Sequence, residues 1–229
     1  MNKNIFSELF VSGIPGYVFA VLIPLLFLIF MLNDKKSKYI LSFFSWGVFS
    51  VLIAFIINEW FMNSPTQLER ATSDVAPIVE ETLKALPLLL FLRNKTYRGN
   101  LIIYCAMAAG IGFSIQETLF YFSNLSTHTG LSDLFPLIIR TLTTCLMHGM
   151  STSVIGFGIT ITAKINRIRI PMVLGLLALA STIHSLFNIL ISTRLAIIAL
   201  SMPAILYLLG LSLLSSGNDT DTQTKSDLV

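Results

Sequence analysis

Long apolar stretches alternate with short polar connectors along almost the whole chain, and seven of these stretches are long enough to cross a lipid bilayer. Their limits are Gly13 to Leu32, Tyr39 to Met62, Ala76 to Leu92, Leu101 to Ser123, Leu134 to Ala163, Ile170 to Ser192 and Leu195 to Ser215. The pattern therefore predicts an all-α membrane protein, a bundle of about seven transmembrane helices.

Lysine and arginine are concentrated in every second connector, beginning with the one around Lys36. Because basic residues mark cytoplasmic loops, this alternation predicts an N-terminus outside the cell and a cytoplasmic C-terminus. We expect residues 1–215 to form a single multi-pass membrane domain and residues 216–229 to form a polar cytoplasmic tail.

Composition agrees with this interpretation. Hydrophobic residues make up 54% of the chain and charged residues only 12%, whereas about a quarter of the residues of a soluble domain are charged. The net charge of +3 is spread over the connectors and forms no dense basic run. We therefore expect no nucleic-acid partner.

The third stretch, Ala76 to Leu92, contains Glu80, Glu81 and Lys84 among its apolar residues. Charged residues inside a transmembrane helix face the interior of the bundle and are functional by default. Lys84 is close enough around the helix axis to pair with either glutamate. It cannot neutralise both, so we expect one carboxylate to remain for a proton, a cation or a water molecule.

Three later stretches contribute further polar residues, and all are expected in the outer half of the membrane or near its midplane. They are Glu117, His148, His184 and Asn188. His184 and Asn188 are four residues apart and so share a helix face. Arg140, two turns before His148, is expected to offset the charge of the acids, and Lys84 to support them.

Carboxylates, imidazoles and an amide together can hydrolyse a peptide bond. A carboxylate accepts a proton from water, and an imidazole and an amide donate hydrogen bonds to the oxyanion. The same residue types bind zinc with an open position for water. Metal-free catalysis and a zinc ion therefore both stay open, the zinc ligands being drawn from Glu81, Glu117, His148 and His184.

The order of these motifs resembles the PrsW family of intramembrane proteases, within the clade of type II CAAX prenyl proteases and bacterial Abi proteins. The likeness covers about residues 76–191 and is carried by Glu80-Glu81-x-x-Lys84, Phe113-x-x-x-Glu117, His148 and His184-x-x-x-Asn188. One departure is Asn188, where PrsW proteins often have Asp; an amide suits an oxyanion donor better than a metal ligand.

The resemblance implies proteolysis of a membrane-anchored protein near the extracytoplasmic face, in PrsW typically an anti-sigma factor in stress signalling, in a bacterial plasma membrane. Glu80 would activate water with support from Glu81, and Glu117 would act as a second base or ligand. His184 and Asn188 would stabilise the oxyanion, and His148 would be a further donor or ligand. The alternative is a non-catalytic scaffold or bacteriocin-immunity-type protein of the same clade.

Overall fold

The structure is a computed structural model and describes residues 33–62, 75–93, 100–124, 131–162, 166–191, 193, 195 and 197–208. These residues form helices, with no strand among them. The helices are α3 (Lys35–Met62), α5 (Ala76–Ala85), the short 3-10 helix η1 (Leu86–Leu88), α6 (Leu89–Arg93), α7 (Asn100–Asn124), α8 (Leu131–Ile161) and α9 (Asn166–Ile191). A shorter apolar helix, Ile197–Leu208, follows α9.

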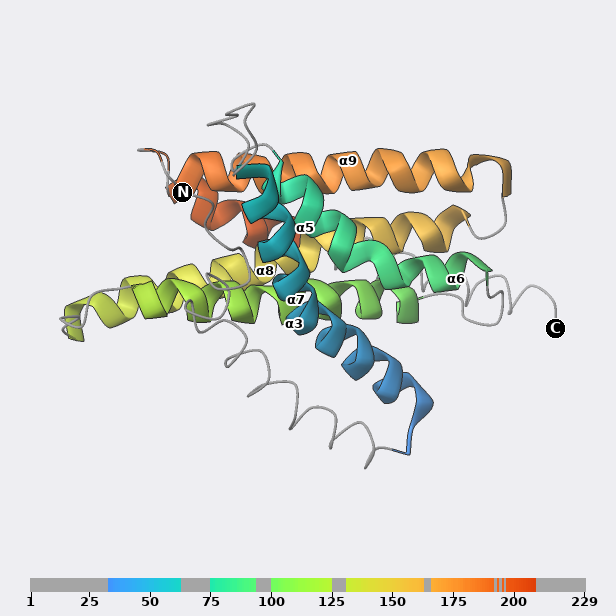
Figure 1. The fold of residues 1–229 in the computed structure, drawn as a ribbon, viewed down its shortest axis with the longest axis horizontal. Helices are drawn as coiled ribbons and strands as arrows, with labels where there is room; N and C mark the ends of the chain where they lie inside the picture. Colours follow the sequence, from blue (N-terminus) through green and yellow to red (C-terminus); the bar gives the residue numbers. More distant parts are fainter. Residues whose placement is uncertain are drawn as a thin grey trace.

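Helix α5 lies at the centre of this arrangement. Helices α7, α8 and α9 extend in roughly the same direction across the molecule, and α3 crosses them obliquely (Figure 1). Helix α7 packs along α8 and against α3, and α9 packs against α8. The short α5 contacts α3, α7, α8 and α9. Side chains of α5 can therefore meet those of several helices.

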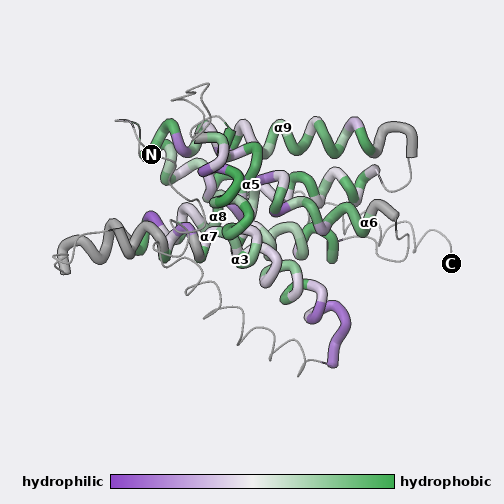
Figure 2. The backbone as a smooth tube through the Cα atoms, viewed as in Figure 1, coloured by the Kyte–Doolittle hydropathy of each residue, from purple (hydrophilic) through white to green (hydrophobic). Residues whose placement is uncertain are grey.

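Four of the described helices are long and apolar enough to cross a membrane, which makes this a multi-pass membrane protein. They cover Lys35–Phe61, Asn100–Leu119, Ile138–Ile161 and Ile170–Ile191, and Figure 2 shows hydrophobic residues along most of their length, with a hydrophilic start to α3. The prediction of an all-helical membrane protein is confirmed to this extent.

The predicted number of seven spans is not confirmed. The first, Gly13 to Leu32, lies outside the described residues, and the seventh is described only as the helix Ile197–Leu208. The orientation of the termini and the boundaries of the domain and tail stay predictions.

The predicted third span is not one continuous α-helix, because η1 interrupts it around Pro87. A proline has no N–H to donate to the carbonyl four residues earlier, here that of Leu83. That oxygen instead accepts the backbone N–H of Leu86 and, at 2.8 Å, the indole N–H of Trp46 on α3. The break is thereby tied to a neighbouring helix.

Replacing Trp46 by Phe removes this indole donor and keeps an aromatic ring. We expect the free energy of unfolding to fall by about 1 kcal/mol and the melting temperature by about 2–4 °C, measured by thermal unfolding in detergent. Trp60→Phe is the matched control, since Trp60 is 62% exposed and keeps its edge contact with Phe61 as a phenyl ring. Equal melting temperatures for the two variants would contradict the role of the Trp46 bond.

Two glycines of α7 lie where neighbouring helices approach closely. A Cβ atom on Gly110 would overlap the carbonyl of His148 on α8, and one on Gly112 would overlap the carbonyl of Phe44 on α3. A different helix approaches α7 at each of these glycines. The contact at Gly110 places the backbone of His148 directly against α7.

Gly110→Ala is therefore expected to separate α7 from α8. Overpacking of this kind costs about 1–3 kcal/mol of stability and would also displace His148. Gly175→Ala on α9 is the control, because a Cβ atom there meets nothing within 4 Å and alanine favours a helix by about 1 kcal/mol. Thermal unfolding of the two variants should shift in opposite directions; a Gly110→Ala protein as stable as wild type would refute the packing argument.

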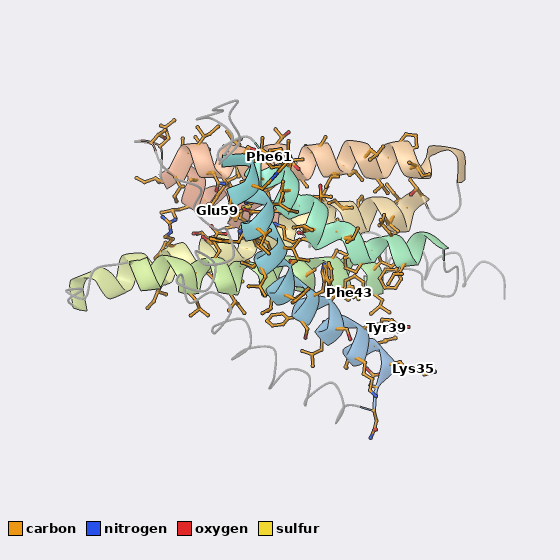
Figure 3. All side chains as sticks on the ribbon, viewed as in Figure 1. Lys35, Tyr39, Phe43, Glu59 and Phe61 are labelled. Atoms are coloured by element: carbon orange, nitrogen blue, oxygen red, sulfur yellow. The ribbon has the colours of Figure 1, made fainter. Side chains whose placement is uncertain are left out.

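Helix α3 begins at a side-chain cap and touches α6 through aromatic rings. Asp34 caps the helix, accepting the Ser37 hydroxyl at 2.7 Å and its backbone N–H at 2.8 Å. The hydrogen bond from the hydroxyl, and to a smaller extent the one from the backbone N–H, lowers the pKa of Asp34 below its usual value. Further along α3, Tyr39 and Phe43 lie beside α6 (Figure 3), where the Phe43 ring stacks on Phe91 with centroids 5.4 Å apart.

Candidate active site

The site begins with the inward face of α5. Pro77, near the first helical position, starts the helix with a φ angle that already suits it. Glu81 and Lys84 are fully buried, whereas Ile78 and Thr82 are exposed. The helix thus turns its charged residues toward α7, α8 and α9 and part of its remaining surface away from them.

Glu81 is the most completely bonded of the candidate residues. Its Oε1 atom accepts hydrogen bonds from Lys84 Nζ at 2.6 Å, Ser151 Oγ at 2.8 Å and His184 Nδ1 at 3.1 Å. Its Oε2 atom accepts from Thr152 Oγ1 at 3.2 Å. The Glu81 side chain is therefore completely buried and is held by hydrogen bonds from α5, α8 and α9.

Lys84 links Glu81 to His148. Its Nζ atom lies 2.6 Å from Glu81 Oε1 and 2.8 Å from His148 Nδ1, and 4.8 Å from the centre of the Phe113 ring. Of the two glutamates that the sequence left open, Lys84 pairs with Glu81. The ammonium group is fully buried and has a carboxylate, an imidazole and an aromatic face around it.

His148 continues the chain of contacts to Glu117 on α7. An ammonium group donates hydrogen bonds and accepts none, so His148 Nδ1 accepts from Lys84 and the ring proton is on Nε2. That Nε2–H points at Glu117 Oε2, 2.5 Å away. The Glu117 side chain is 41% exposed, so this end of the chain of contacts is accessible.

His184 on α9 lies between the two adjacent glutamates. Its Nδ1–H donates to Glu81, and its Nε2 lies 3.7 Å from Glu80 Oε2, which is too long for a direct hydrogen bond. The Glu80 side chain is 18% exposed, and none of the described residues is hydrogen bonded to it. Glu80 and His184 Nε2 therefore each keep a hydrogen-bonding position free for a third molecule.

The structure thus brings together five of the predicted residues and the supporting Lys84, and places two others less directly. Asn188 lies one turn after His184 on α9, half buried, and makes no hydrogen bond to the other candidate residues in the described part of the chain. Arg140 is half buried on α8, two turns before His148. The predicted role of Arg140 in offsetting the acids stays a prediction.

Ser151 and Thr152 also belong to the site, although the sequence did not identify them as candidates. Their hydroxyl groups bind both oxygens of Glu81 from α8. The signal that could have identified them is their spacing, because they follow His148 by three and four residues and so lie on the same helix face. Serine and threonine are common in membrane helices, however, and that spacing alone would not have singled them out.

Three of these residues could hold a metal ion, namely Glu80, His148 and His184, which offer ligand atoms within 4.8 Å of one another. The group shares both histidines with the ligand set expected from the sequence and contains Glu80 in place of Glu81 and Glu117. In the described structure, Glu81 and Glu117 are instead bonded to Lys84 and His148.

Buried acids and histidines that meet at one place in a bundle of membrane helices are what a membrane-embedded hydrolase requires. The sequence model described as PrsW family intramembrane metalloprotease matches residues 35–214, which is most of the chain. The chain therefore belongs to this family, and it is a peptidase whose substrates are membrane proteins. No curated protein and no solved structure is significantly similar to it.

The family description raises the question of whether these residues fit a metal ion. A histidine ligand needs a lone pair on one ring nitrogen and commonly donates the other N–H to a carboxylate or carbonyl. His184 meets this requirement, because its Nδ1–H donates to Glu81 and its Nε2 faces Glu80. His148 does not, because one nitrogen accepts from Lys84 and the other donates to Glu117. As bonded here, the group does not fit a three-ligand metal site.

Proposed function

We propose that this protein is an intramembrane endopeptidase in which Glu80 is the general base. One observation carries the proposal. The Glu80 carboxylate is partly exposed and faces His184 Nε2 at 3.7 Å, and none of the described residues is hydrogen bonded to it. A carboxylate that is close to an imidazole and still free to bind water is suited to take a proton from that water.

The reaction that this arrangement supports is addition of water to a peptide carbonyl. Glu80 accepts a proton while the water oxygen bonds to the carbonyl carbon. Asn188 and the imidazolium form of His184, which has a proton on both ring nitrogens, donate hydrogen bonds to the oxyanion. The carbon–nitrogen bond then breaks, and the proton held by Glu80 passes to the leaving nitrogen. Glu81 keeps the His184 ring oriented through its Nδ1–H.

Glu117 and His148 support the addition of water as a second pair of polar residues, joined to Glu81 through Lys84. Their pair is the accessible end of the chain of contacts that begins at Glu81. Glu117 accepts the His148 Nε2–H and is partly exposed, so it is placed to serve as a second base. Lys84 offsets part of the negative charge of the three glutamates.

For the substrate we propose a membrane-anchored protein that is cut near the extracytoplasmic face of a bacterial plasma membrane, with an anti-sigma factor in stress signalling as the specific expectation. The location follows from the predicted orientation of the spans, and the substrate from the likeness of the motifs to PrsW proteins. The same motifs support a wider relationship to type II CAAX prenyl proteases and Abi proteins.

The experiment that tests this proposal compares new protein N-termini in membranes from cells with wild-type protein or with Glu80→Gln at matched abundance. A small set of single-span proteins should lose an extracytoplasmic cleavage product in the variant. Identical sets of termini under several envelope stresses would contradict proteolysis and favour a non-catalytic scaffold or immunity-type protein.

A further inference from the structure

The site contains a buried cation, the Lys84 ammonium, beside one of the residues that a metal ion would need as a ligand, His148. The Lys84 ammonium has no exposed surface, and it is held by Glu81 Oε1 at 2.6 Å and His148 Nδ1 at 2.8 Å. The face of the Phe113 ring lies 4.8 Å away. These three partners fix the ammonium from three helices, so it cannot leave without breaking both hydrogen bonds.

The direction of these hydrogen bonds determines what His148 can offer. Because Lys84 can only donate, the lone pair of His148 Nδ1 is used, and the proton of the neutral ring is on Nε2. That proton is directed at the Glu117 carboxylate. Neither nitrogen of His148 then has a lone pair for a metal ion, although His148 belongs to the Glu80, His148 and His184 group.

The positive charge of Lys84 also makes His148 a weaker metal ligand. Nδ1 of a histidine ligand is normally a donor to a carboxylate or carbonyl, which makes the ring a better ligand. Here Nδ1 faces a positive charge, which withdraws electron density from the ring and repels a divalent cation on its far side. The other histidine, His184, has the favourable arrangement, with its Nδ1–H on Glu81.

We propose that the Lys84 ammonium is the resident cation of this site, and that its bond to His148 Nδ1 keeps Glu80, His148 and His184 from binding zinc together. The proposal rests on the contacts of Lys84 and not on the proposed proteolysis. Lys84 is thus a positioning residue that holds His148 as a donor to Glu117.

The test measures metal binding directly, by zinc content after dialysis and by cobalt titration followed through its visible absorption. The protein is the full chain purified in detergent, as wild type and as the double variant Lys84→Met with Glu81→Gln. The double variant removes both charges of the buried pair, so no unpaired charge stays behind. We expect the double variant to bind cobalt at least about tenfold more tightly than wild type.

Adding His148→Ala to the double variant should abolish this gain, which shows that the released ligand is His148. Equal cobalt affinities for the double variant and wild type would overturn the proposal. The zinc content of the wild-type protein tests the proposal even if the double variant does not fold. Stoichiometric zinc in wild type that is lost in His148→Ala would overturn the proposal, and wild type that remains free of zinc after dialysis against excess zinc would support it.

Discussion

Replacing Glu80 by Gln is expected to slow peptide hydrolysis by about 10²–10⁴-fold, the usual contribution of a general base. Glutamine has nearly the same shape and cannot accept the proton of water. Because none of the described residues is hydrogen bonded to Glu80, the substitution leaves no partner unsatisfied among them. The folded protein should therefore accumulate at wild-type levels. The measurement is the cleavage rate of a single-span substrate in proteoliposomes.

Glu81→Gln is expected to affect stability more than cleavage, and this distinguishes Glu81 from Glu80. It leaves the buried Lys84 ammonium without its carboxylate partner, so its main effect should be a lower melting temperature and lower abundance. Glu59→Gln, at the other end of α3 from Lys35 (Figure 3), is the comparison for loss of an acid from a different helix. If Glu80→Gln keeps its rate while folded Glu81→Gln loses it, the assignment of the base is wrong.

The sequence was sufficient to predict the helical membrane class and the meeting of the polar residues. Both follow from one physical cause, the high cost of placing charges in lipid. That cost forces Glu80, Glu81 and Lys84 to the inside of the bundle, and the same argument applies to Glu117 on α7. The structure accordingly places Glu117 against His148, 31 residues away along the chain.

Which glutamate pairs with Lys84 could not be predicted from the sequence. Helix geometry allowed Lys84 to pair with Glu80 or Glu81, and the choice depends on where α8 places His148 and Ser151 around it. Tertiary contacts of this kind leave no local signal. The break at η1 is a different case, because Pro87 was visible in the sequence and its effect on the helix follows from the missing N–H.

Lys84→Met is expected to lower the free energy of unfolding by about 3–5 kcal/mol, the cost of removing one partner of a buried ion pair. Methionine has a similar length, so the loss comes from the charge and not from a cavity. Glu81 would keep its hydrogen bonds to Ser151, Thr152 and His184 but lose its ammonium partner. The measurement is thermal unfolding in detergent, together with the abundance of the protein in membranes.

The double variant Lys84→Met with Glu81→Gln makes this prediction specific. Replacing a whole buried pair by neutral groups is often close to neutral for stability, so the second substitution should restore much of what the first removes. Ser151→Ala is a second comparison, because it deletes one hydroxyl donor to Glu81 and should cost about 1–3 kcal/mol. If the single and double variants are equally unstable, Lys84 contributes through packing alone, and Glu81 is not held in place by its charge.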